Sequence, residues 1–425
     1  MALTLQRAPA HQPYERPEPT RPWRLQTVAL TAVTLSVAAV VATGGSPGWA
    51  AVRVVTVVAL GVTAIVISQR GGAGVRAVTA GVAGVFGLSA GAGIGVMHIV
   101  KSDMGLEAVA GAVSLLGGLV LLVIAMILMW RAVPGWWRLL AAPVAFVTVQ
   151  FGLIPLSVAV YSTNVPATHL DKATPADAGF PYREVNFTTS DGARLSGWYI
   201  PSRNGAAVAV LHGSGSTRSS VLPQAEVIAG HGYGVLLFDA RGHGRSTGTA
   251  MDTGWWGDRD LTAAVSWLQG RPDVRPGKIG AVGLSMGGEE AIGAAAADSR
   301  IRAVVAEGAL WRGSMDAGWL PQTLTGYIDR GELAIQTAVT GLLTSAPQPT
   351  SLRRAVAAIS PRPVLLIAGS PEIRGDRYLR DASPANVQLW ELPDTPHIGG
   401  LARHPAEWEG RVTAFLNSTL QPLLR

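Results

Sequence analysis

Charged residues are almost absent from long stretches in the first third of this 425-residue chain. No charge lies between Leu25 and Val52, and uncharged stretches nearly as long follow Arg76 and Glu107. A helix rises about 1.5 Å per residue, so about 20 apolar residues are needed to cross the hydrocarbon of a bilayer. This pattern predicts five membrane-spanning helices, over residues 25–43, 50–69, 76–99, 108–130 and 139–161.

The second of these segments is the least secure span, because only residues 54–69 separate Arg53 from Arg70. It crosses the bilayer if the long Arg53 side chain reaches the interface. A cleaved signal peptide would explain the first segment alone. The four further segments therefore favour a multi-pass membrane domain.

Basic residues flank the five segments unevenly. Eight lie in the N-terminal tail or in the two loops on the same side as that tail, namely Arg7, Arg16, Arg21, Arg24, Arg70, Arg76, Arg131 and Arg138. The other two loops hold only Arg53 and Lys101. Because basic loops stay in the cytoplasm, the tail 1–24 is expected to be cytoplasmic and the chain after the fifth span extracytoplasmic. If residues 50–69 do not span, this orientation reverses for the C-terminal part.

The composition changes after the fifth segment. Residues 162–182 are rich in Pro, Thr, Ala and Asp and are typical of a linker. Residues 183–425 have the mixed composition of a globular domain. The chain has no cysteine, which excludes disulfides and thiolate metal sites, and no metal or cofactor is expected. The net charge of +6 comes without a basic cluster on a patterned helix, so nucleic-acid binding is not expected.

Strand and helix patterns alternate in the C-terminal part. Residues 183–189 and 194–200 alternate apolar and polar residues around an Asp-Gly pair, as a hairpin does. Apolar runs typical of buried parallel strands follow at 206–214, 233–240, 278–285, 301–308, 363–370 and 386–393. Helical patterns lie between them, for example at 257–269 and 286–298. The order predicts an α/β fold with a mostly parallel sheet, and residues 311–360 are expected to form an inserted helical cap.

A serine follows one of these strands between two glycines. Residues 283–287 read Gly-Leu-Ser-Met-Gly, which fits the G-x-S-x-G nucleophile elbow. In such a sharp turn from strand to helix, a β-carbon at Gly283 or Gly287 would clash. The turn lifts the hydroxyl of Ser285 above the sheet edge and directs the N-terminus of a helix toward it. The pattern therefore indicates a nucleophilic serine.

A nucleophilic serine needs a base and a carboxylate that orients the base. His397 is the candidate base, because it follows the last strand and precedes the C-terminal helix. The carboxylate is expected after the strand 363–369, where Glu372 is favoured and Asp376 is the alternative. The backbone N–H groups of Ser214 and Met286 are the expected oxyanion donors, Ser214 from the small-residue loop after residue 211.

Residues 183–422 resemble the α/β-hydrolase superfamily. The resemblance rests on LHGSGS, on DARGHGRS (239–246), on GLSMGG and on the final PHIGGLARHPAEWEGRVTAFL, with nucleophile, acid and histidine in the family's order. It implies a serine hydrolase whose cap sets substrate choice, and a structural role for Asp239 and Arg241. The acid departs from the family pattern, because many relatives have Asp where this chain has Glu372, and Pro371 precedes it. The membrane domain has no counterpart in the resemblance.

The expected function is therefore a membrane-anchored serine hydrolase that cleaves an ester-type substrate through an acyl-enzyme. The neighbouring bilayer favours a lipid-like or acyl substrate. Transfer of the acyl group to an acceptor other than water uses the same residues and stays open, as does peptidase activity. A hydrolase-like binding protein without catalysis is the third alternative. The sequence names no protein partner.

The uneven distribution of basic residues makes a topological prediction. Alkaline phosphatase fused after residue 170 should be active, because it folds only outside the cytoplasm and five spans from a cytoplasmic N-terminus end there. An active cytoplasmic reporter at the same point would contradict the assigned orientation.

Overall fold

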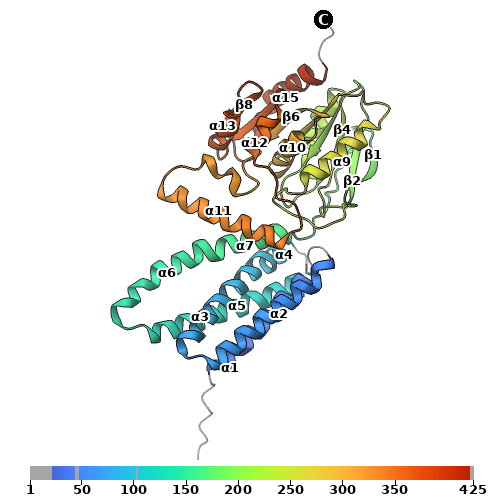
Figure 1. Ribbon diagram of the computed structural model, residues 1–425. Helices are drawn as coiled ribbons and strands as arrows, with labels where there is room; N and C mark the ends of the chain where they lie inside the picture. Colours follow the sequence, from blue (N-terminus) through green and yellow to red (C-terminus); the bar gives the residue numbers. More distant parts are fainter. Residues whose placement is uncertain (1–21, 44–46, 102–103, 422–425) are drawn as a thin grey trace, which may run out of the picture.

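The computed structural model describes residues 22–43, 47–101 and 104–421 (Figure 1). Most of the expected cytoplasmic tail, including Arg7, Arg16 and Arg21, lies outside the described residues. The described chain has an N-terminal part made of helices alone, followed by a part in which helices surround a sheet.

The N-terminal part contains five helices long and apolar enough to cross a membrane. Their ranges are Trp23–Ala42, Ala50–Arg70, Ala73–Val100, Leu106–Ala132 and Gly135–Thr163, close to the five expected segments. They comprise α1 (Pro22–Thr43), α2 (Pro47–Arg70), α3 (Ala73–Ala90) leading through a π-helical stretch to α4 (Met97–Val100), α5 (Leu106–Ala132), and α6 (Ala141–Thr148) leading through a second π-helical stretch to α7 (Ile154–Thr163).

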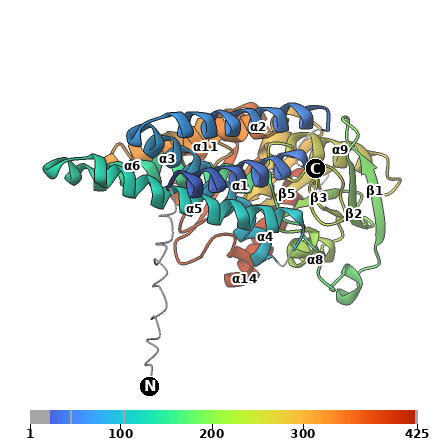
Figure 2. The ribbon, with the colours of Figure 1, turned by 90° about the horizontal axis from the view of Figure 1, so that it is seen from below.

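Small residues let these helices approach each other closely. A β-carbon added to Gly111 on α5 would lie 2.3 Å from the backbone N of Gly95, and one added to Gly118 would lie 2.4 Å from the N of Leu88. Backbones therefore meet directly where α5 crosses the third long helix, as in membrane helix pairs. The views in Figures 1 and 2 agree that α1 lies beside α2 and α5. The outer faces are apolar: on the last long helix, Leu139 is 78% exposed.

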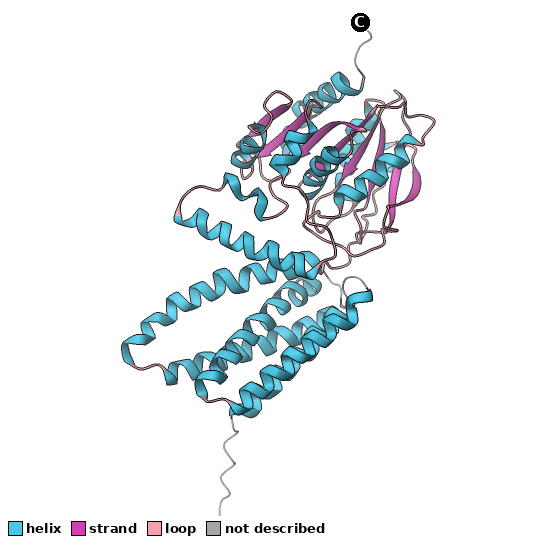
Figure 3. Ribbon diagram, viewed as in Figure 1, coloured by secondary structure: helices cyan, strands magenta, loops and turns pink. Residues whose placement is uncertain are grey.

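The C-terminal part is built on one eight-stranded sheet with the order β1-β2-β4-β3-β5-β6-β7-β8 (Figure 3). The first two strands pair antiparallel, β2 pairs antiparallel with β4, and all later pairs are parallel. The strands are β1 (Arg183–Thr188), β2 (Arg194–Ile200), β3 (Ala207–Leu211), β4 (Gly234–Phe238), β5 (Ile279–Leu284), β6 (Ile301–Glu307), β7 (Val364–Gly369) and β8 (Val387–Leu392). The expected hairpin and mostly parallel sheet are confirmed.

Apolar side chains cover both faces of this sheet, as the continuous Val, Ala, Leu and Ile runs require. One cluster joins the sheet to α9 (Gly257–Gln269), α10 (Met286–Ala297), α12 (Leu352–Ile359) and α13 (Ile373–Arg380). The other joins it to α8 (Leu222–Gly230) and α15 (Pro405–Leu420), where Trp408 is fully buried. A short helix, α14 (Gly400–Arg403), precedes α15.

The expected cap region, residues 311–360, divides into two kinds of structure. A 3₁₀ segment, Ser314–Trp319, and the helix α11 (Leu324–Leu343) stand outside the layers of the sheet. In contrast, α12 packs against α10 and buries Leu352, Val356 and Ile359 in the core. Only the part before α12 therefore lies over the strand ends. Figure 1 shows α11 between the sheet-containing part and α7. The helices α11 and α7 are in contact.

Candidate active site

Ser285 occupies the turn between β5 and α10. Its φ is 53° and its ψ is −122°, a backbone conformation that side-chain-bearing residues rarely adopt. The Ser285 N–H donates to the backbone oxygen of Glu307 on the adjacent strand at 2.7 Å. Such strain persists where surrounding structure enforces it, and it is concentrated at functional sites.

The two glycines of the motif are required by close backbone contacts. A β-carbon on Gly283 would lie 2.0 Å from the carbonyl oxygen of Gly287, and one on Gly287 would lie 2.5 Å from that of Leu211. Both distances are far too short for a real side chain. The turn is therefore restricted to glycine at both positions, because any β-carbon there would clash, as the G-x-S-x-G motif predicts.

Three side chains form a hydrogen-bonded chain beside this turn. The Ser285 Oγ lies 2.9 Å from Nε2 of His397, and Nδ1 of His397 lies 2.8 Å from Oε1 of Glu372. His397 stands in the loop after β8, and Glu372 immediately precedes α13 and is 2% exposed. The hydrogen bond to Glu372 raises the pKa of His397 above its usual value, against the opposing effect of partial burial. This arrangement can pass a proton from the hydroxyl to the imidazole and hold the resulting cation.

Asp376, the alternative acid, lies one helical turn further along α13. It is fully buried, and neither of its carboxyl oxygens has a hydrogen-bond partner among the described residues. Burial raises the pKa of Asp376 well above its usual value, and the charges of Glu372 and Glu289 raise it further. Of the two carboxyl groups left open by the sequence, the structure brings Glu372 to His397.

A cavity of about 120 Å³ opens beside the serine, and both expected oxyanion donors line it with Ser285. Met286 is the first residue of α10, and Ser214 lies in the loop after β3. That loop lies against Ser285, because a β-carbon on Gly213 would lie 3.3 Å from the Cβ of Ser285. Trp255, Trp311, Arg312 and four residues of α11 complete most of the wall, namely Leu333, Gln336, Thr337 and Thr340.

Asp252 holds the loop that carries Ser214. Its Oδ1 accepts the Gly215 N–H at 2.8 Å, and its backbone oxygen accepts the Ser214 hydroxyl at 3.0 Å. Nε2 of His243 lies 3.0 Å from the same Oδ1. The contacts to Ser214 and Gly215 join segments more than thirty residues apart, and the contact to His243 bridges the loop 239–252. No local sequence pattern therefore indicates that Asp252 supports the expected oxyanion donor Ser214.

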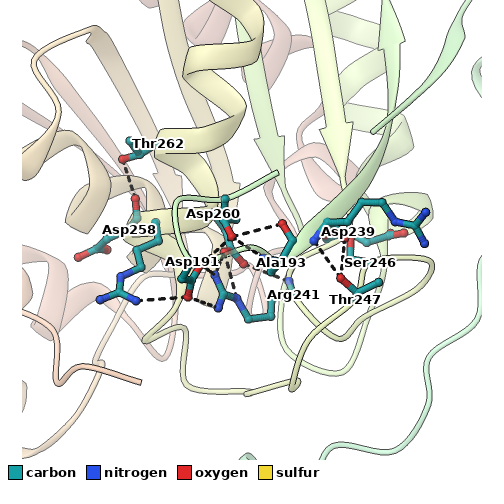
Figure 4. Close-up of polar contacts among 12 residues, drawn as sticks. Asp191, Ala193, Asp239, Arg241, Ser246, Thr247, Asp258, Asp260 and Thr262 are labelled. Atoms are coloured by element: carbon teal, nitrogen blue, oxygen red, sulfur yellow. Dashed lines mark hydrogen bonds and ion pairs between the residues drawn. The ribbon is translucent and has the colours of Figure 1, made fainter. Parts of the chain in front are cut away.

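The DARGHGRS loop is fixed by ion pairs, most of whose charged groups are buried (Figure 4). Arg241 bonds Asp260 at 2.7 Å and Asp191 at 2.7 Å, as Figure 4 shows. Asp239 pairs with the fully buried Arg218 at 3.2 Å. The bond to Arg241 lowers the pKa of Asp191 far below its usual value. These contacts lie within the loop and its neighbours, as a structural role for Asp239 and Arg241 implies.

His212 is excluded as a competing base. Burial lowers its pKa to about 3, and its Nε2 accepts the Ala240 N–H at 2.9 Å. The proton therefore lies on Nδ1, which donates to the oxygen of Gly213 at 2.8 Å. A neutral imidazole with both nitrogens occupied shapes the loop and is not available for proton transfer.

Two buried glutamates near the site were not singled out by the sequence. Glu307 ends β6, and its carboxylate accepts the Gly400 N–H at 2.7 Å and the Trp408 Nε1–H at 2.9 Å. Since its backbone oxygen also accepts the Ser285 N–H, it ties the nucleophile turn to the loop that follows His397. The sequence feature that could have indicated this role for Glu307 is its position at the end of a buried strand.

Glu289, in the first turn of α10, lines the same cavity as Ser285. Its Oε1 accepts the N–H groups of Leu310 and Trp311 at 3.2 and 3.0 Å, and no hydrogen bond of its Oε2 is found among the described residues. Burial raises the pKa of Glu289 to about 7. The cavity therefore contains a carboxyl group that changes charge near neutral pH.

A second hollow, open and of about 790 Å³, lies against α13 and is lined by Trp319, Arg374 and Tyr378 among others, but not by Ser285, His397 or Glu372. No group of three or more His, Asp or Glu side chains in the described part of the chain is placed to hold a metal ion.

The strand order, the serine turn after β5 and the histidine loop after β8 define an α/β hydrolase. Residues 172–386, half of the chain, match the family described as X-Pro dipeptidyl-peptidase (S15 family). The chain belongs to this family.

Curated relatives and solved structures were also found. A thiohydrolase, aneE, from Aspergillus aculeatus is 34% identical over 173 residues, which are 40% of this chain and about half (54%) of that protein. The uncharacterized protein YfhR of Escherichia coli O157:H7 is 28% identical over 249 residues, 56% of this chain and 81% of YfhR. A solved esterase from Pyrococcus furiosus is 29% identical with a TM-score of 0.49, covering 61% of this chain and 98% of that one.

The position of the two carboxyl groups predicts different effects of their substitution. Glu372→Gln should lower kcat by up to about 10⁴-fold, because an amide favours the wrong imidazole tautomer. Asp376→Asn should change kcat little, because burial already favours its neutral form. Steady-state kinetics on both variants, with thermal unfolding as the folding control, test this. A severe Asp376→Asn and a mild Glu372→Gln would reassign the acid.

The contacts of Asp252 predict a catalytic loss when its side chain is removed. Asp252→Ala should lower kcat by as much as about 10²-fold, because the Ser214 loop loses the bonds that fix an oxyanion donor. KM should change less than kcat. Asp273→Ala is the matched control, because it removes a half-buried carboxylate that accepts hydrogen bonds from Tyr199 and Ser202 and does not line the cavity. An equal loss in that variant would show a general effect on stability.

Proposed function

We propose that this protein is a membrane-anchored serine hydrolase that cleaves ester-type acyl substrates through an acyl-enzyme on Ser285. The observation that carries the proposal is the hydrogen-bonded chain from Ser285 through His397 to Glu372. It stands at a turn whose serine is held in a rare backbone conformation. Nucleophile, base and orienting carboxylate at these distances are the arrangement that acyl transfer requires.

The reaction follows from this geometry. As the Ser285 Oγ attacks the carbonyl carbon, Nε2 of His397 takes its proton, and Glu372 stabilises the imidazolium through Nδ1–H. The backbone N–H groups of Ser214 and Met286 hold the oxyanion. The leaving group takes the proton from His397 as its bond to carbon breaks. A water molecule, deprotonated by His397, then releases the acyl group and restores the serine.

Esters and thioesters are the proposed substrates. The relative named a thiohydrolase supports this choice, since a thioester passes through the same acyl-enzyme. Glu289 favours a second candidate, a dipeptidyl peptidase, because its carboxyl group could pair with the free amine of a peptide in the cavity and the family is described by that activity. Parallel assays with acyl esters, acyl thioesters and an X-Pro anilide separate the two candidates by their products.

The anchoring part of the proposal rests on the five apolar helices and on the basic residues at their ends. The Gln26 side chain donates to the backbone oxygen of Arg76 at 3.0 Å, so the basic starts of α1 and α3 lie at the same end. With that end in the cytoplasm, the hydrolase part lies on the extracytoplasmic side.

Single and double substitutions test the mechanism. Ser285→Ala should abolish turnover of short p-nitrophenyl esters apart from the residual rate left by binding and the oxyanion hole, and His397→Ala should do nearly as much harm. The double variant should lose little more, because nucleophile and base act as one unit. Additive losses, or full activity without Ser285, would contradict the proposal.

The raised pKa of His397 makes a prediction about pH. Only neutral imidazole accepts the serine proton, so kcat/KM should rise with pH through the pKa of His397, at a midpoint above the usual histidine value of about 6.5. In Glu372→Gln the midpoint should move to lower pH, because the group that favours the imidazolium is gone. The measurement is the pH profile of kcat/KM for the unsubstituted protein and for Glu372→Gln. A midpoint that is unchanged or higher in the variant would contradict the pairing of His397 with Glu372.

A further inference from the structure

The cap helix α11 has two faces of different character. One face, with Leu333, Thr337 and Thr340, lines the cavity that contains Ser285. Large apolar side chains are exposed on another side of the helix: Leu324 is 78% exposed, Tyr327 59% and Leu342 83%. Large apolar side chains this exposed are unfavourable on a helix surrounded by water.

Charge is distributed unevenly along the same segment. Residues 333–352, which include the C-terminal half of α11 and the connection to α12, contain no Asp, Glu, Lys or Arg. The charged residues of α11 all lie in its N-terminal half, where the Arg330 guanidinium donates to the backbone oxygens of Pro321 and Gly326. The uncharged half therefore has the composition of a helix that meets an apolar phase.

This helix is packed against the last of the five long helices. The Gln150 side chain donates a hydrogen bond to Glu332, and a β-carbon on Gly331 would lie 2.8 Å from the ring of Phe151. The long helix Gly135–Thr163 has 29 residues. At about 1.5 Å per residue it is about 43 Å long, whereas the hydrocarbon is about 30 Å thick.

That excess length places α11 at the membrane boundary. If the span begins at Gly135, about 20 residues carry it across the hydrocarbon, so it leaves near Ile154. The contacts of Gln150 and Phe151 with α11 then lie within about one helical turn of that boundary. Figure 1 shows α11 running across the direction of α1 and α2, at the end of the helical part that faces the sheet.

We propose that the exposed apolar face of α11 rests on the outer surface of the bilayer and that acyl substrates reach the cavity from the lipid phase along this helix. The proposal rests on the membrane anchoring proposed above. A helix with its side chains is only about 10–12 Å across, so one helix separates the lipid from the cavity beside Ser285. The substrate class this selects is a long-chain ester or thioester dissolved in the membrane.

The absence of cysteine from the chain allows a direct test. Leu342→Cys, labelled with an environment-sensitive fluorophore, is placed in phosphatidylcholine vesicles as the full-length protein. Gln388→Cys, on the exposed side of β8, is the matched control. Emission from position 342 should shift to shorter wavelength and be quenched by lipids that carry a quencher near the headgroup, whereas position 388 should resemble water.

Two outcomes would overturn the proposal. Emission at position 342 equal to that at position 388 would place α11 in water. A blue shift that lipid-borne quenchers leave unchanged, and that disappears when the protein is diluted among vesicles, would assign this face to a second copy of the chain.

A kinetic measurement tests the route to the cavity. Leu324→Glu with Leu342→Glu should lower turnover of a long-chain ester in vesicles by about tenfold or more, because two charges oppose contact with the apolar phase. Turnover of a water-soluble short ester should be unchanged. Equal turnover of the long-chain ester would refute entry along α11. If the unsubstituted protein does not turn over the short ester, the hydrolase function itself is refuted. The fluorescence result does not depend on catalysis, so the two failures can be distinguished.

Discussion

The close contact of backbones at the nucleophile turn is the constraint on which the site depends. The end of β5 meets the start of α10 at Gly283, and the start of α10 meets the end of β3 at Gly287, so neither position has room for a side chain. Ser285, between them, takes up a strained conformation. Strain of this kind must be offset by surrounding contacts. The first is the bond from the Ser285 N–H to Glu307 on the neighbouring strand, which anchors the turn to the centre of the sheet.

The rest of the site is attached to the same framework by buried polar groups. Glu307 extends the anchor to the loop after His397, through Gly400 and Trp408. On the other side, Asp252 fixes the loop of Ser214. The Glu307 carboxylate accepts two hydrogen bonds, and Oδ1 of Asp252 contacts the Gly215 N–H and Nε2 of His243. Hydrogen bonds of this kind reduce the cost of burying a carboxylate. Ser285, His397 and the Ser214 loop are thus each held in place by a buried polar contact, and α11 and the loop near Trp311 form part of the remaining cavity wall.

Local patterns were sufficient for the sheet, for the serine turn and for placing His397 after the last strand, because each depends on neighbours in the sequence. The choice between Glu372 and Asp376 could not be made from local patterns, because both residues follow β7. The start of α13 directs Glu372 toward His397 and Asp376 into the core. Asp252 acts on residues 37 positions away, and α12 shows a helical pattern that does not reveal its packing against α10. Such contacts depend on tertiary structure, which no local pattern encodes.

The central claim, that Ser285 is the nucleophile, is tested most directly by a fluorophosphonate probe applied to the purified full-length protein. Such a probe reacts with a serine whose hydroxyl is activated by a base. Mass spectrometry of the digested protein should find one modified peptide, with the label on Ser285, and Ser285→Ala should abolish labelling. A folded protein that stays unlabelled at Ser285, or one whose labelling survives Ser285→Ala, would contradict the account.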